Sequence, residues 1–284
     1  MLRAALRPLL SMTDHRFRLV ALDVDGTLKP RNAPITPGVR DAVARTLASG
    51  IEVTLATGRM FPSVLPFSQE LGLTAPVICL GGAAIRDPRT GATLFERGIP
   101  LALAREVIAA ARERGLSACA YTGDSLLVER VDPASAFAGY VARSRAEVVP
   151  DLLERLTADP SHMAVVSDEV RTRDLVRELR EVFGERLAVT SGHPLLAEID
   201  HPSVSKAVAL ARLAEHLGIK REQVLAVGDD WNDIPMLDYA ALGVAMGDAT
   251  PEVLAAADVV APTAAEDGVA WVLEKYVLVE RPSP

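Results

Sequence analysis

Four short apolar runs stand out along the chain, at residues 18–22, 51–56, 76–80 and 224–228. Each is bounded by turn residues, and none shows the clean alternation of apolar and polar positions that a half-exposed strand would have. Continuous apolar runs are typical of strands that are covered on both faces of a parallel sheet. We therefore predict four buried strands in one parallel sheet.

Two segments between these runs have the apolar spacing of helices. One begins at Thr36-Pro37, where proline can occupy the first helical position, and it ends at Gly50. The other runs from about residue 203 to 217, and Gly218 ends it. Strand followed by helix, repeated along the chain, predicts an open α/β sheet.

The middle of the chain has a different order of elements. Its pattern predicts a strand at 93–95, a helix at 100–114, a hairpin of 116–121 and 126–128, a strand at 163–166, a helix at 169–183 and a strand at 187–190. We predict that residues 85–196 form an inserted α/β domain and that residues 17–84 and 197–284 form the core. Residues 1–16 are predicted to be a flexible N-terminal extension, with Met12 as an alternative start.

Composition narrows the class of protein. The chain has 284 residues, of which 49% are hydrophobic and 24% charged, as in ordinary globular proteins. The net charge of -8 disfavours nucleic acid as a partner, because phosphate backbones select basic surfaces. The two cysteines cannot form a disulfide framework, and no apolar run is long enough to cross a bilayer. These features predict a cytoplasmic protein that binds neither nucleic acid nor membrane.

Polar clusters follow three of the predicted strands. They are Asp23-Val24-Asp25-Gly26-Thr27-Leu28, Thr57-Gly58-Arg59 and Gly228-Asp229-Asp230-Trp231-Asn232-Asp233. A fourth group consists of one polar residue, Lys206, near the start of a predicted helix. Because ligands of open α/β sheets bind at the carboxyl ends of the strands, we expect these groups to converge on one crevice.

These clusters resemble the signature of the haloacid dehalogenase superfamily, and more narrowly of its Cof-type sugar-phosphatase branch. The matching pieces are DVDGTL at 23–28, TGR at 57–59, Lys206 and GDDWND at 228–233, in the family's order. The large insertion falls between the second and third pieces, as in that branch. The resemblance covers residues 17–275 and implies a Rossmann-like doubly wound parallel sheet core with an inserted α/β cap domain.

The resemblance assigns catalytic roles that make chemical sense. Asp23 would be the nucleophile that forms an aspartyl-phosphate. Asp25 would protonate the leaving alcohol and then activate water, and we expect nearby carboxylates to raise its pKa. Thr57 would donate a hydrogen bond to a phosphate oxygen. Lys206 would neutralise charge on the transferring group.

The resemblance also implies a magnesium ion and a set of phosphate contacts. The carboxylates of Asp23 and Asp229 and the backbone carbonyl of Asp25 would bind Mg²⁺, with Asp233 or Asn232 as a further ligand or close neighbour. The substrate-binding residues would be Gly26, Gly58, Arg59 and Asn232, the two glycines because they let backbone N–H groups approach the phosphate. After the third strand this branch commonly has Asn-Gly, whereas this chain has Gly81-Gly82.

The predicted reaction is the Mg²⁺-dependent hydrolysis of a small-molecule phosphate ester, a sugar phosphate or similar metabolite. A phosphomutase and a non-catalytic sugar-phosphate sensor stay open as alternatives. A calcium loop is excluded because Pro34 stands at the twelfth position counted from Asp23. Trp231 is expected to fill a loop, and His162, His193 and His201 are expected to be surface or linker residues.

Overall fold

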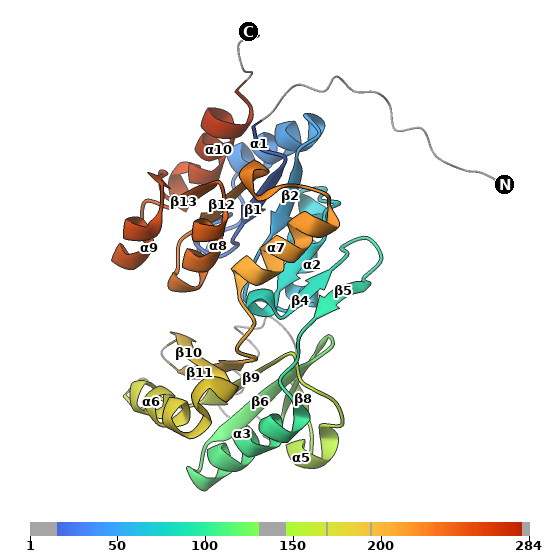
Figure 1. Cartoon of the computed structure of the whole chain (residues 1–284), viewed down its shortest axis with the longest axis vertical. Helices are drawn as coiled ribbons and strands as arrows, with labels where there is room; N and C mark the ends of the chain where they lie inside the picture. The colour runs from blue at the N-terminus through green and yellow to red at the C-terminus, as the bar shows by residue number, and fades with distance from the viewer. Residues whose placement is uncertain (1–15, 131–145, 169, 194, 280–284) are drawn as a thin grey trace, which may run out of the picture.

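The computed structural model describes residues 16–130, 146–168, 170–193 and 195–279 (Figure 1). Its central element is a five-stranded sheet with the order β14-β13-β12-β1-β2, in which all neighbours are parallel. The strands are β1 (Leu19–Leu22), β2 (Glu52–Leu55), β12 (Val224–Gly228), β13 (Leu242–Ala245) and β14 (Val259–Val260).

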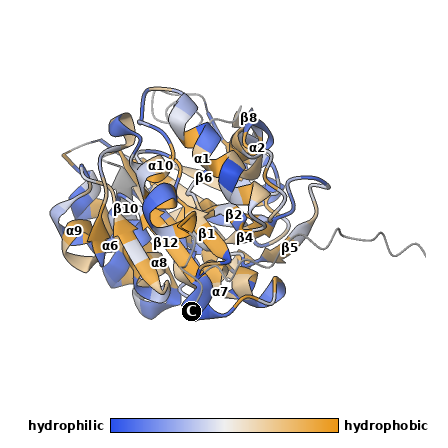
Figure 2. Cartoon of the chain, turned by 90° about the horizontal axis from the view of Figure 1, so that it is seen from above, coloured by the Kyte–Doolittle hydropathy of each residue, from blue (hydrophilic) through white to orange (hydrophobic). Residues whose placement is uncertain are grey.

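Helices cover both faces of this sheet. On one face, Val20 and Leu22 of β1 belong to an apolar cluster with residues of α1 (Pro37–Ala48) and α10 (Gly268–Val272). On the other, Leu19 and Ala21 belong to a cluster with residues of α7 (Lys206–His216), α8 (Ile234–Tyr239) and α9 (Pro251–Ala256). Figure 2 shows the apolar strands β1 and β12 between helices whose outer positions are hydrophilic. The prediction of a doubly wound α/β core is confirmed.

The strand predicted at 76–80 departs from the expected pairing. It is β3 (Val77–Cys79), which meets the parallel sheet only through the Ala56–Ile78 bridge. The chain then turns through η1 (Leu80–Gly82), and β3 pairs antiparallel with β4 (Ala84–Arg86), which pairs with β5 (Thr93–Glu96). The expectation of four strands in one parallel sheet therefore holds for this strand only at one parallel bridge, since its ladder of pairs is the antiparallel one with β4. The chain between β2 and β3 forms α2 (Phe61–Glu70).

Both predicted core helices are present. Thr36 caps α1 by accepting a hydrogen bond from the Val39 amide at 3.3 Å, and Pro37 is its first residue. The second helix begins three residues later than expected, because Ser205 caps it by accepting from the Val208 amide at 3.2 Å. Lys206 is consequently the first residue of α7.

The middle of the chain forms a six-stranded sheet with the order β10-β11-β9-β6-β7-β8. Neighbouring strands are antiparallel except for the parallel pair β7–β8. The strands are β6 (Ser117–Thr122), β7 (Ser125–Val128), β8 (Ala146–Val148), β9 (His162–Val166), β10 (Ala188–His193) and β11 (Leu196–Asp200).

One face of this sheet packs against α3 (Leu101–Glu113), α5 (Leu152–Arg155) and α6 (Thr172–Phe183), in an apolar cluster of its own. Figure 1 shows α3 and α6 on the side of the sheet that is turned away from the five-stranded sheet. The opposite face is therefore turned toward the core. This arrangement determines which side chains can reach a ligand held at the ends of β1 and β12.

The predicted limits of the inserted domain, 85–196, stay a proposal. Strand pairing places β4 beside β3 and β5 beside β4, and it places all of β11, which continues to residue 200, in the six-stranded sheet. Of the predicted N-terminal extension 1–16, only residue 16 lies within the described residues. Among the described residues, no helix has the combination of length and apolarity that a membrane span requires.

Candidate active site

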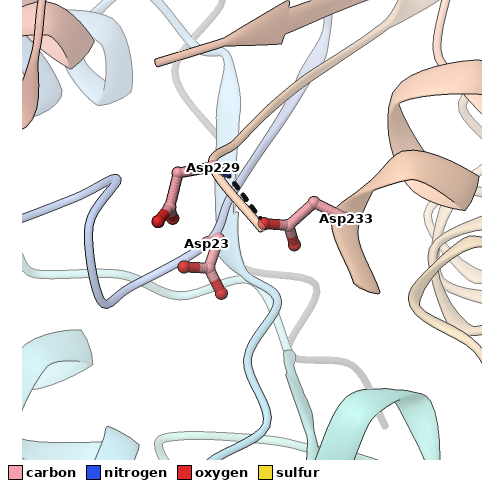
Figure 3. Close-up of side chains that lie close together, drawn as sticks. All are labelled: Asp23, Asp229 and Asp233. Atoms are coloured by element: carbon pink, nitrogen blue, oxygen red, sulfur yellow. Dashed lines mark hydrogen bonds between the residues drawn. The ribbon is translucent and has the colours of Figure 1, made fainter. Parts of the chain in front are cut away.

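Three buried carboxyl groups lie together at the carboxyl ends of β1 and β12. Asp23 follows β1, Asp229 follows β12, and Asp233 ends the short helix η4 (Trp231–Asp233). Each offers an oxygen atom within 4.8 Å of the others (Figure 3). The two strands are parallel neighbours in register, Leu22 beside Val227, so the sheet itself brings the groups together. The predicted convergence of these three residues is what the structure shows.

Lys206 joins the three carboxyl groups from α7. Its Nζ donates to Asp23 Oδ1 at 2.6 Å and to Asp233 Oδ1 at 2.5 Å, and the residue is 1% exposed. The start of α7 can approach the site because Gly82 lies against it: a Cβ there would be 2.3 Å from the Ser205 carbonyl oxygen. Gly82 also has a φ of 111°, which favours glycine.

The loop after β12 is organised by Asp233. Its Oδ2 accepts from the backbone amides of Asp229 and Asp230, each at 3.0 Å, and the first of these bonds is the dashed line in Figure 3. Asp229 is fixed in turn by Thr27, whose hydroxyl donates to Asp229 Oδ1 at 2.8 Å. Gly26 allows this close approach, since a Cβ on it would lie 2.2 Å from Asp229 Oδ2.

Burial and mutual repulsion disfavour charge on these carboxyl groups. Burial is the main cause that raises the pKa of Asp23 to about 8, with Lys206 opposing and Asp233 and Asp229 adding to the rise. Burial likewise raises the pKa of Asp229 to about 6, against the hydrogen bond from Thr27. Burial opposes charge on Lys206, but the attraction of Asp23 and Asp233 outweighs it and raises the pKa of the amine. An added cation would relieve this excess of negative charge.

Asp25 has the opposite electrostatic environment from the one predicted. Burial raises its pKa, but hydrogen bonds and charge from Arg59 and Lys29 outweigh burial, so the pKa is lowered. Both Nε and Nη2 of Arg59 donate to the two carboxylate oxygens, and Lys29 Nζ lies 3.2 Å from Oδ1. The expectation of a raised pKa is wrong, because two cations contact Asp25 more closely than any carboxylate does.

Thr57 and Gly58 line the crevice next to these groups, as predicted from their place after β2. The Thr57 Oγ1 accepts from the Arg59 amide at 3.2 Å, which leaves its own O–H as a donor. Gly58 has no atom within 4 Å of the position that a Cβ would take, so the backbone there is open. Asn232 also lines the crevice, together with Asp23, Asp25 and Arg59.

The six-stranded sheet forms the far side of the crevice. The word crevice here means two adjoining hollows, whose lining residues include four in common: Gly58, Asn232, His162 and Glu198. The hollow over Asp23 has an empty volume of about 790 Å³, part of it open to solvent. The ends of β1 and β12 and one face of the six-stranded sheet therefore enclose one space.

Several residues at or beside the crevice were not predicted as site residues. Lys29 and Arg31 come shortly after the first motif. Lys29 contacts Asp25, and Arg31, which lines the crevice, donates from Nη2 to Asp229 Oδ2 at 2.7 Å. In the sequence, the only indication of a role for these two residues is that two cationic side chains stand close to Asp23 and Asp25. His162, expected at the surface, is largely covered, with its side chain 12% exposed, and it lines the crevice. Trp231, expected to fill a loop, lines the second hollow. For His193, nothing is described of the side chain.

Comparisons with known proteins agree with this geometry. The family model of haloacid dehalogenase-like hydrolases matches residues 20–273. The chain is 28% identical to the pyridoxal phosphate phosphatase YbhA of Escherichia coli, over 92% of this chain and 99% of that protein. It is 27% identical to the 5-amino-6-(5-phospho-D-ribitylamino)uracil phosphatase YitU of Bacillus subtilis, over 91% of this chain and 97% of that protein. A crystal structure of a haloacid dehalogenase-like hydrolase from Bacteroides thetaiotaomicron superposes with a TM-score of 0.85 at 28% identity, covering 91% of this chain and 99% of that one.

Proposed function

The chain belongs to the haloacid dehalogenase-like hydrolase family, and from this premise we propose that it is a Mg²⁺-dependent phosphomonoesterase that acts through an aspartyl-phosphate on Asp23. One observation carries the proposal: Asp23, Asp229 and Asp233 offer oxygens within 4.8 Å of one another, and Lys206 is bound to two of them in a buried position. A phosphate ester is an anion, so an anionic nucleophile needs positive charge beside it.

The donor set fits magnesium. It consists of carboxylate oxygens, and no His or Cys belongs to any metal-binding group among the described residues. We propose that Asp23, Asp229 and the backbone carbonyl of Asp25 would hold the ion. Asp233 would position Lys206 and the loop, since its oxygens already accept from them. When bound, Mg²⁺ would neutralise charge on the phosphoryl group and on the carboxylates around it.

In the first step, a carboxylate oxygen of Asp23 attacks phosphorus, and the bond from phosphorus to the leaving oxygen breaks. Lys206, whose Nζ lies 2.6 Å from Asp23 Oδ1, orients the nucleophile and stabilises the charge on the transferring group. Thr57 donates its O–H to a phosphate oxygen. Arg59 Nη1, which is buried and has no hydrogen-bond partner among the described residues, is a further donor for that group.

Asp25 serves both steps by moving one proton. Its lowered pKa suits the second step, in which the carboxylate takes a proton from the water that attacks phosphorus and releases inorganic phosphate from Asp23. In the first step, Asp25 gives a proton to the leaving oxygen. Arrival of a phosphate dianion raises the pKa of a neighbouring carboxyl group and so favours the protonated form when substrate is bound.

The substrate does not follow from the relatives. Two of them, at 28% and 27% identity, are named for different esters, pyridoxal phosphate and a ribitylamino-uracil phosphate. We propose a small phosphorylated metabolite, a sugar phosphate or similar compound, for this chain. The residues that contact the leaving group must decide among such compounds, because the phosphoryl group is common to all of them.

The test is phosphate release from metabolite monophosphates with Mg²⁺, by the wild type and by Asp23→Asn. We expect turnover by the wild type and a loss of at least about a thousandfold in the variant, since an amide cannot attack phosphorus. Asp248→Asn is the matched control, because Asp248 is exposed and lies outside the crevice. Equal turnover by Asp23→Asn would refute the assignment. Binding of esters without phosphate release by the wild type would favour the sensor.

A further inference from the structure

The second of the two hollows extends the crevice beyond the one that lies over Asp23. It shares Gly58 and Asn232 with that hollow, and Lys206 also lines it. Its empty volume is about 670 Å³, part of it open to solvent. The apolar residues that line it come from the core and from the six-stranded sheet: Leu80, Val204, Trp231, Pro235 and Ala188. A leaving group that extends from a phosphoryl group at Asp23 can therefore enter an apolar space, and this second hollow is the leaving-group end of the crevice.

Trp231 is the largest side chain that lines this hollow, and it is 37% exposed, although tryptophan is strongly buried on average. Its backbone is fixed in η4: the amide donates to Asp230 Oδ1 at 2.8 Å, and the carbonyl accepts from the Ile234 amide. The other tryptophan, Trp271, packs edge-on against Tyr276 with ring centroids 5.8 Å apart. Within the described part of the chain, no ring or cation contacts Trp231 in this way. Its indole is therefore a positioned ring whose surface a molecule in the hollow can cover.

The turn after β3 leaves space in the same hollow. Leu80 and Gly81, which both line it, have φ values of 50° and 63°. A non-glycine residue rarely adopts such a φ, and positions where the surrounding structure enforces it cluster at ligand sites. The turn is bound to the motif after β2, since the amides of Leu80 and Gly81 donate to the carbonyls of Arg59 and Thr57, each at 3.0 Å. A Cβ on Gly81 would have no atom within 4 Å, so glycine keeps this space free of any side chain.

The six-stranded sheet contributes a second ring to this hollow. His162 of β9 lines it, with Nδ1 2.7 Å from Asp200 Oδ1. The imidazole also lies edge-on to Tyr121, with ring centroids 4.9 Å apart. These contacts hold the imidazole in one orientation. Two positioned rings, one from each wall, suit a rigid and flat occupant, because such an occupant loses little conformational freedom on binding.

We propose that the second hollow binds a planar ring of the leaving group, with Trp231 as the residue that contacts the ring and Gly81 as the residue that leaves space for it. This inference rests on the proposed function and deepens it. Among small phosphorylated metabolites, it favours esters of alcohols that carry an aromatic or heteroaromatic ring. Aromatic pairs in offset-stacked or edge-to-face contact stabilise a complex beyond the burial of their surface, and saturated rings of the same size lack this contribution.

The first experiment compares benzyl phosphate with cyclohexylmethyl phosphate, which both release a primary alcohol and differ in whether the ring is aromatic. We expect the wild type to use benzyl phosphate with a kcat/KM about 2- to 10-fold higher. In Trp231→Leu the ratio of the two kcat/KM values should fall to about one, whereas Trp231→Phe, which keeps a ring, should keep the preference. Trp271→Leu is the matched control and should keep the wild-type ratio, because Trp271 lies outside the crevice.

The second experiment fills the space at Gly81. Asparagine tolerates a left-handed φ better than most residues, so Gly81→Asn should keep the turn and place a side chain in the hollow. The ratio of kcat/KM for benzyl phosphate to that for acetyl phosphate, which is small and has no ring, should fall at least about tenfold. Gly115→Asn is the matched control: Gly115 has a φ of 68° and equally open surroundings, but it lies outside the crevice, so the ratio should stay as in the wild type.

The outcomes separate the two proposals, and each ratio is taken within one variant, so a loss of folded protein does not change it. Equal use of benzyl and cyclohexylmethyl phosphate by the wild type, or an unchanged ratio in Trp231→Leu or Gly81→Asn, would overturn the ring site. Hydrolysis of acetyl phosphate with neither ring ester would also overturn it. Failure to release phosphate from any of the three would contradict the phosphatase instead. Calorimetric binding to Asp23→Asn with Mg²⁺ would then still decide the ring site, which predicts tighter binding of benzyl phosphate and loss of this difference when Trp231→Leu is added.

Discussion

Replacing Asp233 by asparagine tests how the buried charges hold the site together. Asp233 is fully buried, and both of its oxygens are used: Oδ1 accepts from Lys206 at 2.5 Å and Oδ2 from the amides of Asp229 and Asp230 at 3.0 Å. An asparagine can present its one oxygen to the amides or to Lys206, but not to both. In either orientation its NH₂ group faces a donor, and the charge opposite Lys206 is lost.

The magnitude follows from these contacts. Removing one partner of a buried ion pair costs about 3–5 kcal/mol of unfolding free energy. Part of this cost is offset, because Asp233 also repels Asp23 and contributes to the raised pKa of that group. We therefore expect about 3 kcal/mol. At about 2–4 °C per kcal/mol for chains of roughly this size, the melting temperature should fall by about 6–12 °C.

Thermal unfolding of metal-free protein measures the effect, with Asp230→Asn as the control in the same loop. Asp230 is partly exposed, and its carboxylate accepts from the Trp231 amide at 2.8 Å, a bond that an asparagine oxygen can keep. We expect its melting temperature to change by less than about 2 °C, as is usual for surface positions. Equal melting temperatures for Asp233→Asn and wild type would refute the reasoning. The reasoning would also be refuted if Asp233→Asn lost Mg²⁺ binding as completely as Asp229→Asn does, because Asp233 would then be a direct ligand of the metal.

Three further predictions concern protons and metal. Asp25→Asn should lower kcat/KM, which reports the first step, by about 10²- to 10⁴-fold for alkyl phosphates and by less for para-nitrophenyl phosphate, since nitrophenolate leaves without a proton; equal losses of kcat/KM for both esters would contradict the role as acid. Exhaustive EDTA treatment should abolish turnover, Mg²⁺ should restore it and Ca²⁺ should not, because Ca²⁺ prefers a larger and looser oxygen shell; full activity after EDTA would argue against the metal. The unfolding free energy of metal-free protein should fall as pH rises from about 4 to about 8, because folded Asp23 keeps a proton, with a pKa of about 8, that the unfolded chain loses near the ordinary 3.8; denaturant titrations showing no such slope would contradict the raised pKa.

The convergence of the acidic residues could be predicted from sequence because it depends on local features. Asp23 and Asp229 each follow an uninterrupted apolar run, and such runs form neighbouring parallel strands whose carboxyl ends coincide. The position of Lys206 follows from a helix start, although Ser205 and not Ser203 caps the helix. Strands β13 and β14 were not predicted. Two residues, in β14, give too short a pattern to separate from a loop, whereas β13, with four residues, is as long as β1 and β2.

The ionisation of Asp25 could not be predicted in the same way. It depends on Arg59, which comes from the end of a different strand, and on Lys29, which reaches Asp25 only because the chain turns back after Gly26. A motif gives the order of acids and bases along the chain, whereas a pKa depends on their distances in space. Two carboxyl groups separated by one residue, Asp23 and Asp25, consequently have pKa values shifted in opposite directions.

The wall of the crevice that the six-stranded sheet forms shows why a family signature does not specify the substrate. His162, Glu198 and Asp200 occupy alternate positions of ordinary strands, where a polar residue usually indicates a solvent-exposed face. Which face is exposed depends on where α3 and α6 pack, and which residues meet depends on the register of β9 with β11. A substitution at any of these positions would change the leaving-group end of the crevice without altering one residue of the phosphoryl motifs. Substrate preference can therefore differ among relatives that share the same phosphoryl chemistry. It depends on the register of strands in the six-stranded sheet, which no short sequence motif specifies.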